Sequence, residues 1–338
     1  MWNWIDSTQG RRALVLGATG GVGGEVAHTL AAQGWNVRAM HRNPMAVAGR
    51  GSGWTWVQGD AMRAEDVLRA AEGADVIVHA VNPPGYRRWS ELVLPMVDST
   101  IAAALAHGAR IVLPGTVYNY GPDAFPLLRE DSPQRAVTRK GAIRVEMERR
   151  LADSGVQTLV VRGGDFFGPR AGNNWFSQGL LTPGKPVRTI SYPGARGVGH
   201  QWSYLPDVAQ TIAQLLDRTP ASTFETFHMA SHWDADGTRM VEAIQRAVVH
   251  GGGAMPRVRA FPWALMMAAS PFVATLREMR EMRYLWKVPL QLDGTKLAAT
   301  LGSEPHTPWD VAVQATLEGL GCVHVSSPRQ IGASALAP

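Results

Sequence analysis

The chain has 338 residues, of which 45% are hydrophobic and 18% are charged, and its formal net charge is +5. This composition is typical of a globular protein with a substantial core, and no long polar tract indicates disorder. The single cysteine, Cys322, excludes an internal disulfide framework, and the scattered basic residues form no nucleic-acid reading motif.

Two segments bear on location. Residues 1–6 lack the basic and apolar regions of a secretory signal. The apolar stretch 261–276 is interrupted by Pro262 and Pro271, and it is too short to cross a bilayer. We therefore expect a cytoplasmic protein with no membrane span and no nucleic-acid partner.

Strand-like and helical segments alternate through the first half of the chain. We predict strands at 13–16, 36–40, 54–57, 75–80, 110–113 and 158–162, and helices near 22–33, 63–72, 90–107 and 135–153. Short apolar runs that alternate with longer periodic ones indicate βαβ units. The predicted fold class is therefore α/β, with a doubly wound parallel sheet covered by helices on both faces.

After Arg162 this alternation weakens, and residues 163–200 are rich in Gly, Pro and Asn. We predict strands at 187–191, 224–229 and 257–260, and helices at 205–217, 237–249 and 263–286. The change indicates a core followed by a smaller C-terminal lobe.

A glycine-rich turn lies between the first strand and the first helix. It reads Gly17-Ala18-Thr19-Gly20-Gly21-Val22-Gly23. Glycines let a pyrophosphate approach the backbone, and a helix N-terminus offers it free N–H groups and a positive dipole end. The turn predicts a Rossmann-type dinucleotide site in residues 1–165, with a substrate lobe in residues 166–338 of which about 200–230 returns to the core.

The residues after the next strands refine the cofactor. The second strand is followed by Arg42, where an acid would select NAD. A guanidinium can pair with a 2′-phosphate, so we expect NADP, with NAD less favoured. The third strand is followed by Asp60 and Ala61 and the fourth by Val81 and Asn82, at the edge where ligands bind in such sheets.

Four motifs resemble the extended short-chain dehydrogenase/reductase family, which includes nicotinamide-dependent epimerases, dehydratases and reductases. They are the glycine turn, Gly115-Thr116-Val117-Tyr118, the run from Arg162 through Gly163 to Pro169, and Tyr204-Leu205-Pro206-Asp207-Val208-Ala209. The C-terminal run 292–305 also resembles the ending of that family. The resemblance covers nearly the whole chain and implies Gly163 as a further cofactor contact.

The family's chemistry uses a Ser or Thr, a Tyr and a Lys, and this chain departs from that set. The Tyr-x-x-x-Lys position reads Ala136 to Lys140, so the lysine is present without the tyrosine. The serine position falls on Leu113-Pro114, with Thr116 the nearest hydroxyl. The resemblance therefore implies Lys140, Thr116 and Tyr118 as catalytic candidates.

Four interpretations of Lys140 stay open. It binds the cofactor ribose while Tyr118, Tyr120 or Tyr86 donates the proton, or it acts itself as acid/base through a ribose hydroxyl or water. It binds cofactor in a protein that senses NADP without turnover. Alternatively, it is a solvated helix lysine among several arginines.

The substrate is expected above the strand ends, between the core and the later lobe. The loops predicted there are aromatic and mixed polar, and the candidates are Tyr86, Tyr120, Asn174, Trp175 and Trp202. The histidines show no metal-ligand spacing, so we expect no metal.

The sequence thus predicts an NADP-dependent oxidoreductase with an atypical catalytic set. Its substrate would be a small, apolar or aromatic carbonyl, activated alkene or secondary alcohol. The alternatives are a non-catalytic NADP-sensing protein and a nucleotide-sugar epimerase or dehydratase. The resemblance also implies a homodimer through helices 90–107 and 135–153.

Overall fold

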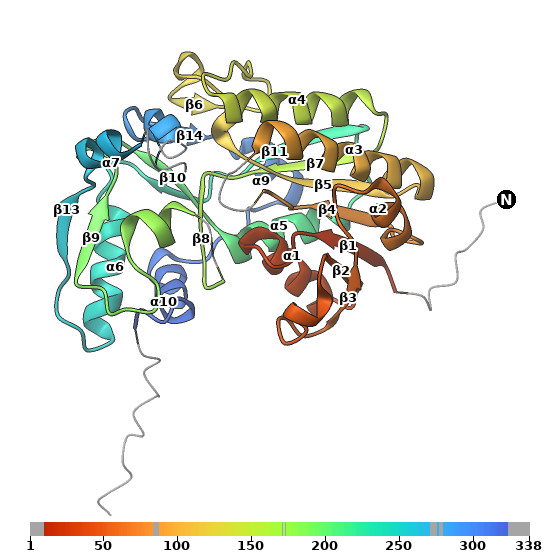
Figure 1. Cartoon of the computed structure of the whole chain (residues 1–338). Helices are drawn as coiled ribbons and strands as arrows, with labels where there is room; N and C mark the ends of the chain where they lie inside the picture. The colour runs from red at the N-terminus through yellow and green to blue at the C-terminus, as the bar shows by residue number, and fades with distance from the viewer. Residues whose placement is uncertain are drawn as a thin grey trace, which may run out of the picture.

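The computed structural model describes residues 10–83, 88–170, 172, 174–270, 276 and 280–323. Seven parallel strands form its main sheet, in the order β11-β7-β5-β4-β1-β2-β3 (Figure 1). Their bounds are β1 (Arg12–Leu16), β2 (Asn36–His41), β3 (Trp54–Gln58), β4 (Val76–His79), β5 (Arg110–Gly115), β7 (Thr158–Arg162) and β11 (Phe224–His228). The predicted doubly wound parallel sheet is confirmed, as are all six strands predicted for the first half.

Both faces of the central strands of the sheet are buried, which is why these strands read as largely continuous apolar runs. In β1, Ala13 and Val15 pack into one hydrophobic cluster while Leu14 and Leu16 pack into another on the opposite face. This follows from the two-residue repeat of a strand, which sends successive side chains to opposite sides.

Helices cover each face. The first cluster lies under α1 (Gly21–Ala32) and α5 (Leu205–Leu216), and the second lies under α2 (Ala64–Ala70), α3 (Trp89–His107) and α4 (Arg139–Asp153). Among the described helices, α3 is the one that is long and apolar enough to cross a membrane. Its apolar residues Val93, Met96 and Val97 pack into the second cluster, so core burial accounts for its composition.

The rest of the chain builds a second body beside the C-terminal edge of the sheet (Figure 1). Its small sheets have the orders β12-β10-β8, β13-β9 and β14-β6. Their strands are β6 (Leu127–Leu128), β8 (Asp165–Phe167), β9 (Thr189–Tyr192), β10 (His200–Tyr204), β12 (His232–Asp234), β13 (Arg257–Ala260) and β14 (Gln291–Leu292). The helices there are α6 (Arg239–His250), α7 (Trp263–Ala269) and α10 (Trp309–Gly319), whereas α9 (Thr295–Leu301) packs against β11 of the main sheet.

Two helix predictions need correction. Helix α4 begins at Arg139 rather than near 135, because Thr138 has extended backbone and its side chain accepts a hydrogen bond from the Gly141 N–H at 3.0 Å. Ala136 therefore precedes the helix, whereas Lys140 lies in its first turn.

The helix predicted at 263–286 is found in part: residues 263–269, 276, 280 and 281 are helical. Helix α7 ends at Ala269, and residues 282–286 form a separate 3₁₀ helix. At the end of α7, Ser270 Oγ donates to the Met267 carbonyl at 2.9 Å.

Candidate functional site

A cavity of about 630 Å³ runs along the C-terminal edge of the main sheet. Its lining residues come from the loops after β1, β2, β3, β4 and β5 and from the segment after β7. Because the strand order places β2 and β3 at one side and β5 and β7 at the other, the cavity has two distinct ends. This edge is where open α/β sheets bind ligands.

The glycine turn lies over the middle of the cavity, where Thr19, Gly20, Gly21 and Val22 line it. Helix α1 begins there with Gly20 as its N-cap, no side-chain cap and no acid in the first turn. The first N–H groups of the helix are thus left for an anion.

Two of the glycines are required by packing. A Cβ on Gly17, whose φ is +91°, would lie 2.5 Å from the Ala80 carbonyl oxygen, and a Cβ on Gly23 would lie 2.4 Å from the Gly17 carbonyl oxygen. Gly17 also lines the cavity, whereas Gly23 is not among the lining residues. The turn therefore approaches both the fourth strand and the helix more closely than any side chain allows.

Arg42 and Asp60 lie at the end formed by β2 and β3. Both line the cavity, together with Ala61. Arg42 is exposed, so its guanidinium can move to meet an anionic group. The Asp60 side chain accepts from the Met62 N–H at 3.0 Å, which fixes the loop after β3.

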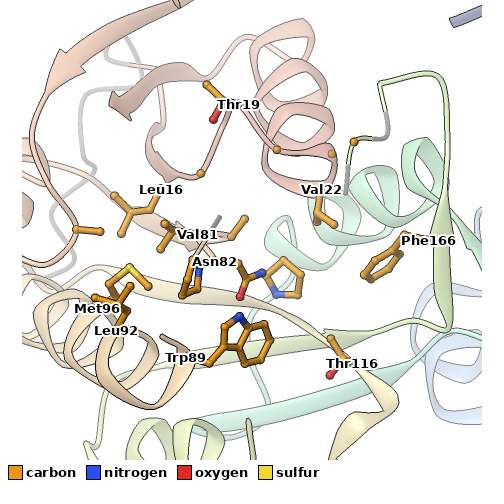
Figure 2. A pocket seen from close by; sticks show the side chains of 18 of the residues that line it. Leu16, Thr19, Val22, Val81, Asn82, Trp89, Leu92, Met96, Thr116 and Phe166 are labelled. Atoms are coloured by element: carbon orange, nitrogen blue, oxygen red, sulfur yellow. The ribbon is translucent and has the colours of Figure 1, made fainter. Parts of the chain in front are cut away.

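The middle of the opposite wall carries Trp89, and two cations lie close to its ring. Trp89 is nearly buried and lines the cavity with Val81 and Asn82, as Figure 2 shows. Arg144 also lines it, donates to Asn82 Oδ1 at 2.9 Å, and lies 5.3 Å from the centre of the Trp89 ring. Lys140 Nζ lies 5.6 Å from the same ring, but Lys140 is buried and is not a lining residue. Arg144, rather than the predicted Lys140, therefore reaches the cavity wall.

The far end of the cavity is formed by the loops after β5 and β7. Thr116, Tyr118, Asn174 and Trp175 line it, and Figure 2 shows Thr116 on the same side as Trp89, with Phe166 nearby. The Thr116 hydroxyl is buried and has no hydrogen-bond partner within the described part of the chain. A buried hydroxyl of this kind is suited to a bound ligand.

A buried ion pair holds the Thr116 loop in place. Arg162 is fully buried, donates to the Thr116 carbonyl at 2.5 Å, and pairs with Glu148 at 2.7 Å. Burial alone would raise the pKa of Glu148, but the charge and hydrogen bond of Arg162 hold it below its usual value. Burial and the same guanidinium lower the pKa of His228, 3.2 Å from Arg162, to about 3.

Several predicted site residues lie elsewhere. Tyr120 and Trp202 are fully buried in the core of the second body and do not line the cavity, because their rings fill space between its strands and helices. Gly163 is not a lining residue either, since it packs against Phe166 and Ser203. The prediction for Tyr86 falls outside the described residues.

The cavity lining includes residues that the sequence predictions omitted: the aromatic residues Trp89 and Phe166, and the charged residues Arg144 and Asp165. Arg144 lies four residues after Lys140, so helical periodicity placed it on the lysine's face. Asp165 begins β8, a strand that was not predicted, and its carboxylate lies 2.8 Å from His200.

Asp207, His232 and His306 come together with ligand atoms within 4.8 Å of one another. Asp207 accepts from the Thr307 hydroxyl at 2.6 Å and from its N–H at 2.8 Å, and His232 Nε2 lies 2.8 Å from the Thr307 carbonyl. These bonds explain the cluster as an attachment of the C-terminal segment to the start of α5.

Comparisons with known proteins fit this geometry. A family model described as NAD(P)H-binding matches residues 17–189. A 3-diazoavenalumate denitrifying reductase from a Streptomyces species is 31% identical over 182 residues, which cover 48% of this chain and 58% of that protein.

Solved structures share the fold at lower identity. UDP-glucose 4-epimerase from Thermotoga maritima has a TM-score of 0.70 at 16% identity, covering 91% of this chain and 98% of that one. UDP-glucuronic acid 4-epimerase from Bacillus cereus, in complex with NAD, has a TM-score of 0.68 at 13% identity, with coverages of 91% and 98%.

Proposed function

The chain belongs to the NAD(P)H-binding family, and we propose that it is an NADP-dependent oxidoreductase of the extended short-chain type. Hydride passes between the nicotinamide and a carbonyl, activated alkene or secondary alcohol of a small, apolar or aromatic substrate. The observation that carries this proposal is one continuous cavity that extends from Arg42, past the uncapped start of α1, to the Thr116 hydroxyl, which has no hydrogen-bond partner among the described residues.

The residues present fit a dinucleotide phosphate. Gly20 and Gly21, with the free N–H groups of α1, would hold the pyrophosphate, and Arg42 would pair with the 2′-phosphate. Val81 and Asn82 would contact the nicotinamide side. When bound, the nicotinamide supplies or accepts the hydride.

The far end would hold the substrate. The Thr116 hydroxyl would bind the substrate oxygen, while Trp89, Phe166 and Trp175 supply apolar and aromatic surface. Lys140 and Arg144 keep positive potential at Trp89, which favours the negative charge that develops on that oxygen. In this proposal Lys140 contributes positive electrostatic potential from beside the Trp89 ring, without lining the cavity, and Arg144 contributes it from the cavity wall.

The proposal is tested by cofactor binding and turnover together. Purified protein should be stabilised more by NADPH than by NADH, and it should oxidise NADPH when offered aldehydes, enones, ketones or 3-diazoavenalumate, the compound in the name of its reductase relative. Binding of NADPH without oxidation by any of these would favour a sensor of NADP. Preference for NAD together with stabilisation by UDP-sugars would overturn the proposal in favour of an epimerase.

A further inference from the structure

Asp165 and His200 form a buried carboxylate–imidazole pair at the far end of the cavity. Asp165 Oδ2 lies 2.8 Å from His200 Nε2, and the two residues are only 8% and 5% exposed. Asp165 lines the cavity, whereas His200 is not a lining residue. Asp165 is therefore the member of the pair that contributes to the cavity lining.

The fold fixes this pair. Strands β8 and β10 are parallel neighbours in which Asp165 is paired with Trp202. His200 lies two residues before Trp202 and so shares its face of β10. The imidazole is stacked on Trp286, with ring centres 3.7 Å apart and planes 8° apart. Its orientation toward Asp165 is therefore set by packing.

The charges around the pair are few. Within the described residues, the ion pair that the structure gives Asp165 is the one with His200. Tyr192 and Tyr284 lie nearby, and burial raises the pKa of both phenols. Negative charge raises it further, from Asp234, Asp236 and then Asp165 at Tyr192 and from Asp165 at Tyr284. Asp234 faces His200 across β10 and β12. The raised pKa values disfavour ionisation of these phenols, and the short contact between Asp165 and His200 is the one through which a proton can pass.

We propose that Asp165 is the proton donor and acceptor of this site, and that His200 positions it and restores its proton. This inference rests on the proposed function. The pair replaces the family's tyrosine, whose position is Ala136 in this chain. Asp165 follows β7 and Thr116 follows β5, its neighbour in the sheet, so an acid and a hydroxyl line the same end of the cavity.

For a carbonyl substrate, the step balances as follows in the direction of reduction. The carbonyl carbon receives hydride from NADPH, and the C=O π pair moves to oxygen. Asp165, as the carboxylic acid, gives its proton to that oxygen and becomes a carboxylate. His200, protonated from solvent, returns a proton through Nε2 to Oδ2. The products are the alcohol and NADP⁺, with one proton consumed, and the reverse direction uses the same groups as base.

The first test needs no turnover. The oxidised nicotinamide carries a positive charge and the reduced one does not, so an Asp165 carboxylate at this end binds the oxidised form more tightly. At about pH 8, where an ordinary imidazole is neutral, Asp165→Asn should weaken binding of NADP⁺ relative to NADPH by about tenfold. Asp310→Asn is the matched control, because Asp310 is exposed on α10 and pairs with Arg246.

The second test measures reduction in a single turnover. Asp165→Asn should slow it by about 10²-fold or more, the usual contribution of a general acid. His200→Gln should slow it less and change its pH profile, which a purely structural role would not do. Tyr118→Phe tests the competing tyrosine, and the exposed control Asp310→Asn should retain the full rate. Thermal unfolding of each variant identifies those that fail to fold, and His200→Asn serves as a second variant at that position.

The outcomes separate the two proposals. Wild-type protein that binds no NADPH, or binds it and reduces nothing, contradicts the proposed function. If the wild type binds NADPH but Asp165→Asn leaves the NADP⁺/NADPH affinity ratio unchanged, the inference about Asp165 is wrong. Loss of activity in Tyr118→Phe with near-normal activity in Asp165→Asn would likewise overturn it in favour of the tyrosine.

Discussion

Replacing Arg42 tests how this chain distinguishes its cofactor. Arg42 follows β2, is exposed and lines the end of the cavity formed by β2 and β3. In the proposed complex, its guanidinium meets the 2′-phosphate that distinguishes NADPH from NADH. Arg42→Ala removes this charge without disturbing a buried contact, so the fold should be unaffected.

The size of the effect follows from the interaction lost. Hydrogen bonds to a charged group contribute about 1.5–3 kcal/mol, which corresponds to a loss of roughly 10- to 150-fold in affinity. Because Arg42 is exposed, we expect the lower part of this range. NADH has no 2′-phosphate, so its dissociation constant should change by less than about threefold.

Tryptophan fluorescence provides the assay, since Trp89 lines the cavity. Dissociation constants for NADPH and NADH should be measured for the wild type, Arg42→Ala and the control Arg50→Ala, which removes another exposed arginine that does not line the cavity. Equal losses for both cofactors, or no loss for either, would refute the assignment of Arg42 to the 2′-phosphate.

Three further predictions concern buried groups. Glu148→Gln leaves Arg162 buried without its counter-charge and should lower the free energy of unfolding by about 3–5 kcal/mol in a urea titration; a change below about 1 kcal/mol would contradict the role of the pair. Burial, and after it the charge of Arg144, lowers the pKa of His79 to about 3 from its ordinary value of 6.5. Between pH 6.5 and about pH 3, His79 therefore binds a proton in the unfolded chain but not in the folded one. Stability should therefore fall as the pH falls below about 6.5, and His79→Asn should reduce that slope by up to one proton, whereas an unchanged slope would refute this account. Arg144→Met should slow NADPH oxidation more than Lys140→Met does, because Arg144 alone of the two lines the cavity; the reverse order in steady-state kinetics would restore the lysine as the principal cation.

The parts of the fold that could be predicted are those in which local pattern and burial agree. The strands of the main sheet are apolar runs between helices. Every residue of β5 and β7 is buried, because helices cover both faces of the sheet. The glycine turn can be recognised from the spacing of its glycines along the sequence. The structure gives the physical reason for that spacing, because Gly17 and Gly23 permit contacts that no side chain allows.

The second body was harder to predict, because its strands are short and paired with distant segments. Strand β10 reads His200-Gln201-Trp202-Ser203-Tyr204 and is wholly buried, although it mixes polar and aromatic residues. Its partners β8 and β12 are three residues each. Polar residues such as His200 are accommodated there by specific partners, which no periodicity in the sequence indicates.

The candidate site also has a part that the sequence could predict and a part that it could not. The residues after β1 to β4 were placed by the rule that ligands bind at the C-terminal edge of a parallel sheet. Trp202 was misplaced because an aromatic residue in a loop-like segment has the same sequence signature as one in a core. Lys140 kept its position in α4, but which cation reaches the cavity depends on how Trp89 packs, and that is decided by tertiary contacts.

The most direct measurement of the central claim is deuterium transfer from NADPH labelled at nicotinamide C4. Protein and labelled NADPH are incubated in a single turnover with each member of the substrate panel, and the products are analysed by mass spectrometry. We predict deuterium at one carbon of a reduced product, transferred from one face of the nicotinamide. Tight NADPH binding without deuterium in any product, at substrate concentrations shown to saturate the protein, would contradict an oxidoreductase and leave a protein that binds NADP without turnover.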